Sequence, residues 1–149
     1  MASRGGGLGD QLRNDQKAFK KEIKKILVIA SNEAVNFFQD NFRRQGFLNR
    51  SLKPWKKRKH NTDPGRGVLI GKGGGEKLFD SISRTGLKAK SVTIGIKGNP
   101  QKYASVHNFG LRSGRGKGFI MPKRQFMGES VVLNKKISRL IQRRIKKIL

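Results

Sequence analysis

The chain has 149 residues, of which 35 are Lys or Arg and nine are Asp or Glu, giving a formal net charge of +26. Because so much positive charge repels itself in a compact state, we expect a polyanion or an acidic protein surface beside the working protein, with nucleic acid the first candidate. The absence of cysteine excludes disulfides, cysteine-based zinc sites and thiol nucleophiles. The longest strongly apolar run, residues 26–30, is far shorter than the ~20 residues that a membrane-spanning helix needs.

The N-terminal third predicts a tail followed by one long helix. Residues 1–9 are rich in glycine and predict a flexible tail, and residues 10–149 are predicted to form a single domain. From about Asp10 to Phe42, apolar residues recur at helical spacing on one stripe: Phe19, Ile23, Ile26, Leu27, Ala30, Ala34, Phe37 and Phe38. Val28 and Ile29 lie off this stripe and indicate a second covering surface, from this chain or a neighbouring copy. Gly46 is expected to help end the helix.

The middle of the chain predicts short strands joined by turns. Residues 43–66 are predicted to be a basic, polar connection with a turn at 63–65, and 68–70 a short strand that Gly71 to Gly75 ends. Residues 78–82 fit either a strand or a helical turn. Residues 91–96 alternate apolar with small or polar side chains, which predicts a half-buried strand.

The C-terminal third predicts a loop and a second helix. A turn at 99–100 precedes 103–109, whose type the sequence leaves open, and 111–118 is predicted to be a loop rich in glycine and arginine. Residues 130–149 place Leu133, Ile137, Leu140, Ile141, Ile145 and Ile148 on one face and basic residues on the other. The expected class is α+β, with a long N-terminal helix, a small antiparallel β-sheet and a C-terminal amphipathic helix.

Two basic loops are candidate contacts to DNA or to an acidic partner. They are Lys56, Lys57, Arg58 and Lys59 beside Trp55, and Arg112, Arg115 and Lys117 on a glycine-rich backbone. Such loops follow phosphates without reading bases, although each also fits an ordinary solvated loop. The cationic helices fit an anionic membrane surface as well, but their stripes suffice for core packing, so we expect no membrane contact.

The sequence contains no group of residues with the types and spacing of a known catalytic site. Only His60 and His107 offer imidazole, and the acids are scattered, so we expect no enzyme, no metal and no cofactor. A nuclease using Glu76, Asp80 and Glu129 stays open as a weaker alternative. The segment 67–73 has the wrong spacing for a phosphate-binding loop and lacks its Ser or Thr, so it is interpreted as a flexible connection.

From Trp55 onward the chain resembles a known family. Trp55 with Arg58, Val68-Leu69-Ile70, Leu78 with Ser81-Ile82, and Val92-Thr93-Ile94-Gly95 come in a familiar order. Two more specific boxes follow, Tyr103-Ala104 with His107-Asn108-Phe109-Gly110, and Pro122-Lys123-Arg124-Gln125-Phe126. Over roughly residues 55–133 this is similar to the phage virion morphogenesis family, the tail-completion proteins like protein G of phage Mu.

The resemblance implies a structural, non-enzymatic virion protein at the head–tail junction, assembled in the host cytoplasm. It implies a homo-oligomeric ring of the neck or tail-completion region, which contacts other neck, portal or tail proteins and, through basic residues, the double-stranded genome. Tyr103, His107, Phe109, Arg124 and Phe126 are the candidate subunit-interface residues, with ordinary core packing as their alternative. The alternative function is a soluble, sequence-nonspecific nucleic-acid-binding protein of ribosomal or nucleoid type.

Overall fold

The computed structural model describes residues 7–60, 62–72 and 75–149 and has the predicted α+β class. The elements, in chain order, are α1 (Leu8–Arg44), β1 (Gly46–Leu48), β2 (Leu52–Pro54), β3 (Ile82–Leu87), β4 (Val92–Ile96), α2 (Gln101–Phe109), β5 (Arg112–Ser113), β6 (Phe119–Ile120) and α3 (Val131–Lys146). Within the described residues the strands form three separate antiparallel pairs, β1–β2, β3–β4 and β5–β6, where the sequence predicted a single small sheet.

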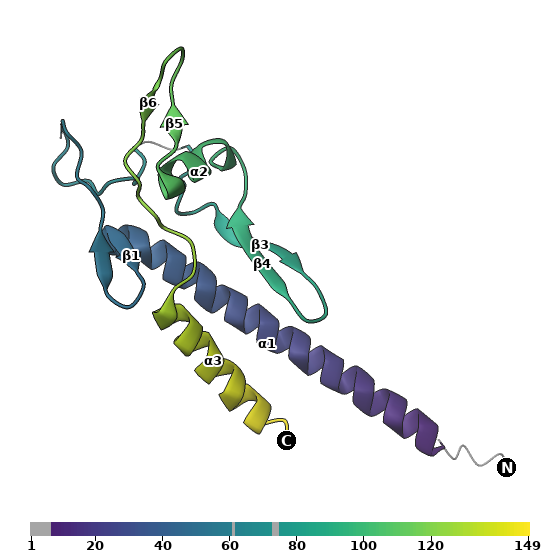
Figure 1. The fold of residues 1–149 in the computed structure, drawn as a ribbon. Coiled ribbons are helices and arrows are strands. Elements are labelled where there is room, and N and C mark those ends of the chain that lie inside the picture. The colour runs from purple at the N-terminus through teal and green to yellow at the C-terminus, as the bar shows by residue number, and fades with distance from the viewer. Residues whose placement is uncertain (1–6, 61, 73–74) are drawn as a thin grey trace.

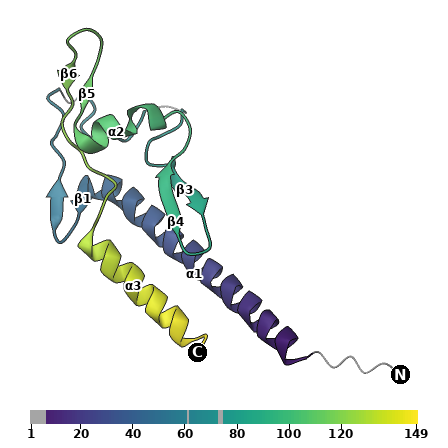
Figure 2. The same ribbon diagram turned by 45° about the vertical axis from the view of Figure 1, so that its right-hand side comes forward.

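The long helix α1 is the axis on which the other elements are arranged (Figure 1). Helix α3 runs antiparallel beside it, and the β3–β4 hairpin lies along another side of its middle (Figures 1 and 2). Helix α2 and the β5–β6 hairpin gather near the C-terminal end of α1, while the N-terminal part of α1 extends past α3 and past the tip of β3–β4 (Figure 2). The molecule therefore has a crowded end and a bare end.

The long predicted helix is confirmed, but its boundaries have causes that the sequence did not show. Residues 1–6 of the predicted tail lie outside the described residues, and the helix already begins at Leu8. At the other end Gln45, not Gly46, adopts the left-handed conformation that ends α1, with φ of 52°. Gly46 instead starts β1, where a Cβ atom would lie 2.6 Å from the carbonyl oxygen of Lys53 on β2. The glycine is needed for this close approach of two strands.

The core lies at the crowded end, around the last turns of α1. Phe42 and Phe126 are each 1% exposed, and their ring centroids are 5.1 Å apart. Trp55 meets Phe42 edge to face at 5.3 Å, and Leu78 and Ile82 close the cluster from the segment before and at the start of β3. Segments from all parts of the chain thus bury their apolar side chains against one helix end.

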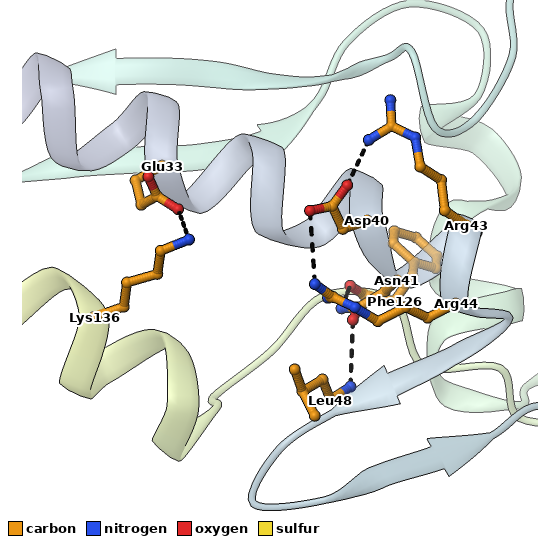
Figure 3. A network of polar contacts seen from close by, with 8 residues as sticks. All are labelled: Glu33, Asp40, Asn41, Arg43, Arg44, Leu48, Phe126 and Lys136. Atoms are coloured by element: carbon orange, nitrogen blue, oxygen red, sulfur yellow. Dashed lines mark hydrogen bonds and ion pairs between the residues drawn. The ribbon is translucent and has the colours of Figure 1, made fainter.

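Two buried asparagines hold the backbone of Phe126 from opposite sides. Asn41 of α1 is 0% exposed; its Nδ2 donates to the Phe126 carbonyl at 3.0 Å, and its Oδ1 accepts from the Leu48 N–H at 3.2 Å (Figure 3). Asn108 of α2 accepts from the N–H groups of Phe126 and Met127 at 2.9 and 3.0 Å. A segment without regular secondary structure therefore has its buried polar groups paired by side chains.

Helix α3 begins where the chain docks onto β1, near the predicted position 130. Ser130 is its N-cap: the hydroxyl accepts from the Leu133 N–H at 3.2 Å and donates to the Leu48 carbonyl at 2.8 Å. Further along, Glu33 of α1 pairs with Lys136 of α3 (Figure 3). The amphipathic pattern predicted this helix correctly because the pattern is local to it.

Several predictions for the middle of the chain are wrong. The connection at 43–66 contains the last two residues of α1 and the β1–β2 hairpin. Residues 68–70 are not a strand: Leu69 has φ of +62°, and both backbone groups of Val68 pair with the side chain of Gln45. Tertiary contacts with the helix end thus override the local strand preference of three branched residues.

Most of the remaining segments have regular secondary structure. The half-buried strand at 91–96 is confirmed as β4, and the ambiguous 78–82 is a turn leading into β3. The segment 103–109 belongs to α2, and the loop at 111–118 is a hairpin whose strands are β5 and β6. Val28 and Ile29 are half-buried on α1 in a groove that is lined by α1 residues alone. Within the described residues, no helix combines the length and apolarity that crossing a bilayer requires.

We predict that Asn108→Ala lowers the free energy of unfolding, because the buried N–H groups of Phe126 and Met127 lose their acceptor. The cost of an unpaired buried donor is about 1–3 kcal/mol for each group. Urea unfolding followed by circular dichroism measures the change, with Asn134→Ala on the exposed face of α3 as the control. Equal unfolding midpoints for the two variants would contradict the role given to Asn108.

Candidate functional site

A basic pocket of about 360 Å³ opens at the crowded end of the molecule, beside the end of α1. Its walls carry four cationic side chains and no acidic one. The lining residues are Arg44, Gln45, Pro54, Trp55, Lys57, Arg58, Pro64, Arg66, Gly67 and Val68. The pocket joins the first predicted basic loop to the end of α1 and to Gly67 and Val68.

Trp55 and Gln45 build the pocket. The Trp55 ring is buried, its Nε1 donates to the Gln125 carbonyl at 2.7 Å, and its backbone N–H donates to the Gln45 carbonyl at 2.8 Å. The Gln45 side chain in turn pairs with the backbone of Val68, which draws the 63–68 segment toward the helix end. These bonds fix the position of the basic segments on either side.

Arg58, Arg124 and His107 form a row of cationic or potentially cationic groups. Arg124 is only 7% exposed, its Nε donates to the Lys56 carbonyl at 3.0 Å, and its backbone N–H donates to the His107 carbonyl at 2.8 Å. Burial lowers the pKa of Arg124, and the charge of Arg58 lowers it further. Burial lowers the pKa of His107, and the charge of Arg124 adds to the effect. Neither arginine forms an ion pair with any residue that the structure describes.

This row is electrostatically unfavourable as it stands. Two neighbouring guanidinium groups, one of them buried, repel each other more strongly than they would in water. Arg58 reaches a backbone acceptor, the Gly67 carbonyl at 2.8 Å, but a carbonyl carries no neutralising charge. Arg58 lines the basic pocket and Arg124 does not, so an anion in the pocket would contact Arg58 directly and gain from Arg124 only through its charge.

The other two arginines of the pocket have partial partners. Arg66 lies 3.6 Å from Asp63, and its Nε is buried without a hydrogen-bond acceptor in the described part of the chain. Arg44 lies 3.6 Å from Asp40, which also pairs with Arg43 (Figure 3). The sequence did not indicate Arg44 and Arg66 as site residues, because they approach Arg58 only through the fold and no spacing marks them.

The second predicted basic group lies on the β5–β6 hairpin. Arg112, Arg115 and Lys117 are exposed, and the Arg112 guanidinium donates to the Lys117 carbonyl across the turn. Both views place this hairpin and the 56–60 loop at the end of the molecule away from the N-terminus (Figures 1 and 2). The two basic groups therefore share one end, which we call the cationic end: the 56–60 loop, the basic pocket and the β5–β6 hairpin.

The predicted subunit-interface residues divide into two sets. Phe126 and Arg124 are buried by other residues of this chain, as the alternative of core packing predicted. Little of either side chain is therefore exposed to contact another subunit. Tyr103 and Phe109 are exposed on α2, and His107 is half-buried with its ring 5.9 Å from that of Tyr103. Leu111, just before β5, and Phe119 and Ile120 of β6 are exposed as well.

The acids of the nuclease alternative are only partly brought together. Glu76 and Asp80 line one groove, where a Glu76 oxygen accepts from the Asn99 N–H at 2.8 Å, whereas Glu129 is not among its lining residues. In the ranges that the structure describes, no three His, Asp or Glu side chains are grouped to hold a metal ion. The Glu76 contact is that of a side chain pairing a turn N–H.

Comparison with known proteins identifies the family. Residues 11–146 match the model of the phage virion morphogenesis family, which covers nearly the whole chain and confirms the family suggested by the two sequence boxes. Neither a curated protein nor a solved structure gives a match.

We predict that His107 makes the stability of the fold depend on pH. Its pKa is lowered from the ordinary 6.5, so the unfolded chain binds the proton more tightly than the folded one. The free energy of unfolding should therefore fall as the pH drops below 6.5 and level off once the pH is below the folded pKa.

Urea midpoints at two pH values, above and below this window, measure the effect in the wild type, His107→Gln and His60→Gln. The first variant should show a smaller fall, while the second, at an exposed position, should retain it. The same fall in all three proteins would mean that His107 is not its source.

Proposed function

The chain belongs to the phage virion morphogenesis family, and from this premise we propose that it is a neck or tail-completion protein of a tailed phage. Family membership supports a structural role in the virion rather than an enzymatic one. Within the particle, the protein forms a homo-oligomeric ring at the head–tail junction, next to other neck, portal or tail proteins. Its cationic end contacts genomic DNA or acidic neighbouring proteins.

The observation that carries the anion contact is the lining of the basic pocket, where Arg44, Lys57, Arg58 and Arg66 meet with no acidic residue among the lining residues. A ring multiplies a subunit charge of +26 by the number of copies, so repulsion between subunits needs an anionic counterpart in the assembly. DNA supplies it without any base-specific contact, because phosphate binding by Lys and Arg releases counterions from the duplex. The exposed apolar side chains of Phe119 and Ile120 on the β5–β6 hairpin, within the cationic end, support a protein neighbour there.

Loss of the protein is expected to leave DNA-filled heads whose tails are absent or unstable. Electron microscopy of particles from a phage with an early stop codon in this gene tests the role, with complementation by the wild-type gene as the control. Infectious virions of normal shape from the mutant would contradict it. Wild-type protein found on cellular nucleic acid rather than in particles would favour the alternative of a soluble nucleic-acid-binding protein.

The cationic end is expected to dominate DNA binding. Lys57→Gln with Arg115→Gln should reduce the slope of the logarithm of the binding constant against that of salt concentration by about 0.9 for each phosphate that the variant no longer neutralises. The charge-matched control is Lys88→Gln with Lys90→Gln, in the exposed turn of the β3–β4 hairpin, where we expect little change. Fluorescence anisotropy of a labelled duplex measures both.

Equal reductions of the slope for the two pairs would mean that DNA responds only to total charge and would contradict a DNA-binding end. Unchanged slopes for both pairs would assign the cationic end to acidic protein neighbours.

A further inference from the structure

No other described segment packs on the N-terminal part of α1. Every described residue from Leu8 to Lys21 is exposed, and Figures 1 and 2 show this part extending beyond α3 and the β3–β4 hairpin. We call residues 8–21 the arm. At 1.5 Å per residue it is about 21 Å long.

The arm carries the bare continuation of a stripe that is buried further along the same helix. Leu8, Leu12 and Phe19 are 74%, 56% and 51% exposed. At 3.6 residues per turn they fall within about 60° of Ile26 and Ala30, which the fold buries. The apolar face of α1 therefore extends past the surface that the other described residues cover.

Asp15 lies on the same stripe, between Leu12 and Phe19. It forms no ion pair with any described residue, whereas Asp10, on the opposite side of the helix, pairs with Arg13 at 3.1 Å. The four basic residues of the arm, Arg13, Lys17, Lys20 and Lys21, lie off this stripe at 3.6 residues per turn, so Asp15 is the charged residue on the stripe itself. The stripe therefore favours a partner that offers apolar surface and positive charge.

This chain itself has such a surface. A groove of about 390 Å³ runs between α1 and α3, lined by Glu33, Lys136, Leu140, Arg143, Arg144 and Lys147. Glu33 pairs with Lys136, while Arg143, Arg144 and Lys147 form no ion pair in the described part of the chain. We call it the α1–α3 groove. Leu140 supplies apolar surface in this groove.

The arm cannot reach the groove of its own chain. Helix α1 is unbroken from Leu8 to Arg44, so the arm continues the helix that forms one wall of that groove. We propose that the arm of one copy packs its apolar stripe into the α1–α3 groove of a second copy, with Asp15 facing the arginines of that groove. The inference rests on the proposed homo-oligomer and specifies which surfaces join its subunits.

The two joined surfaces differ, so the contact is heterologous. Each copy offers one arm and one groove, and repeated head-to-tail contacts close into a ring when the rotation between copies allows it. The arrangement sets Asp15 of one copy against the basic groove of the next and leaves each cationic end free for an anionic partner.

Sedimentation velocity of the full chain tests the contact, in salt sufficient to screen the net charge. The wild type should associate with rising concentration, and Leu12→Gln with Phe19→Gln should raise the dissociation constant by on the order of a hundredfold. Lys17→Gln with Lys20→Gln, on the other side of the arm, is the control and should leave association intact. Far-ultraviolet circular dichroism verifies that each variant keeps its helices.

A charge reversal identifies the groove. Asp15→Arg should weaken association by about tenfold, Arg143→Glu with Arg144→Glu should do likewise, and the combined protein should recover it. Failure of the combined protein to recover, or an oligomer unchanged by Leu12→Gln with Phe19→Gln, would overturn the arm contact and leave the proposed ring standing. A wild type that stays monomeric at every concentration would also overturn it, while the particle experiment separately decides the role in the virion.

Discussion

The pairing of the Phe126 backbone with Asn41 and Asn108 is the constraint on which the rest of the structure depends. The segment around Phe126 has no regular secondary structure, yet it lies at the centre of the core, so its polar groups need partners. Asn41 of α1 and Asn108 of α2 supply these partners, so both helices are held to the same segment. The carbonyl of the preceding residue, Gln125, accepts a hydrogen bond from the ring N–H of Trp55. Arg124, one residue earlier, lies close enough to Arg58 for the charge of Arg58 to lower its pKa. The basic pocket is therefore a consequence of how the core is closed.

This arrangement separates two tasks along one helix. At the C-terminal end of α1, core packing places positive charges close together, and their mutual repulsion makes the site receptive to an anion. At the N-terminal end, the same apolar stripe that builds the core continues beyond it on the arm. A chain of charge +26 can associate with copies of itself only where repulsion is smallest or where an anion offsets it. The proposed ring sets Asp15 of one arm against the basic groove of the next copy, and an anion offsets the charge at the cationic end.

The sequence predicted those elements whose signal is local. The periodicity of α1 and α3 and the alternation of β4 located them to within a few residues, and the family boxes identified the family. The sequence failed where distant contacts decide: Val68 is held by Gln45 instead of pairing in a strand, and Gly46 is required by the approach of β2. The same limit applies to the site. Arg58 was predicted from its basic run, but Arg44 and Arg66 join it only in the fold, and Phe126, for which the sequence left interface and core open, is buried in the core.

The most direct test of this account is a cryo-electron microscopy map of the phage neck in which the chain can be traced. We predict that each pocket at Arg58 lies against a phosphate or a carboxylate, and that each arm lies on a neighbouring copy. A map in which the pocket and the β5–β6 hairpin face only bulk solvent, away from the genome and from acidic protein, would contradict the account.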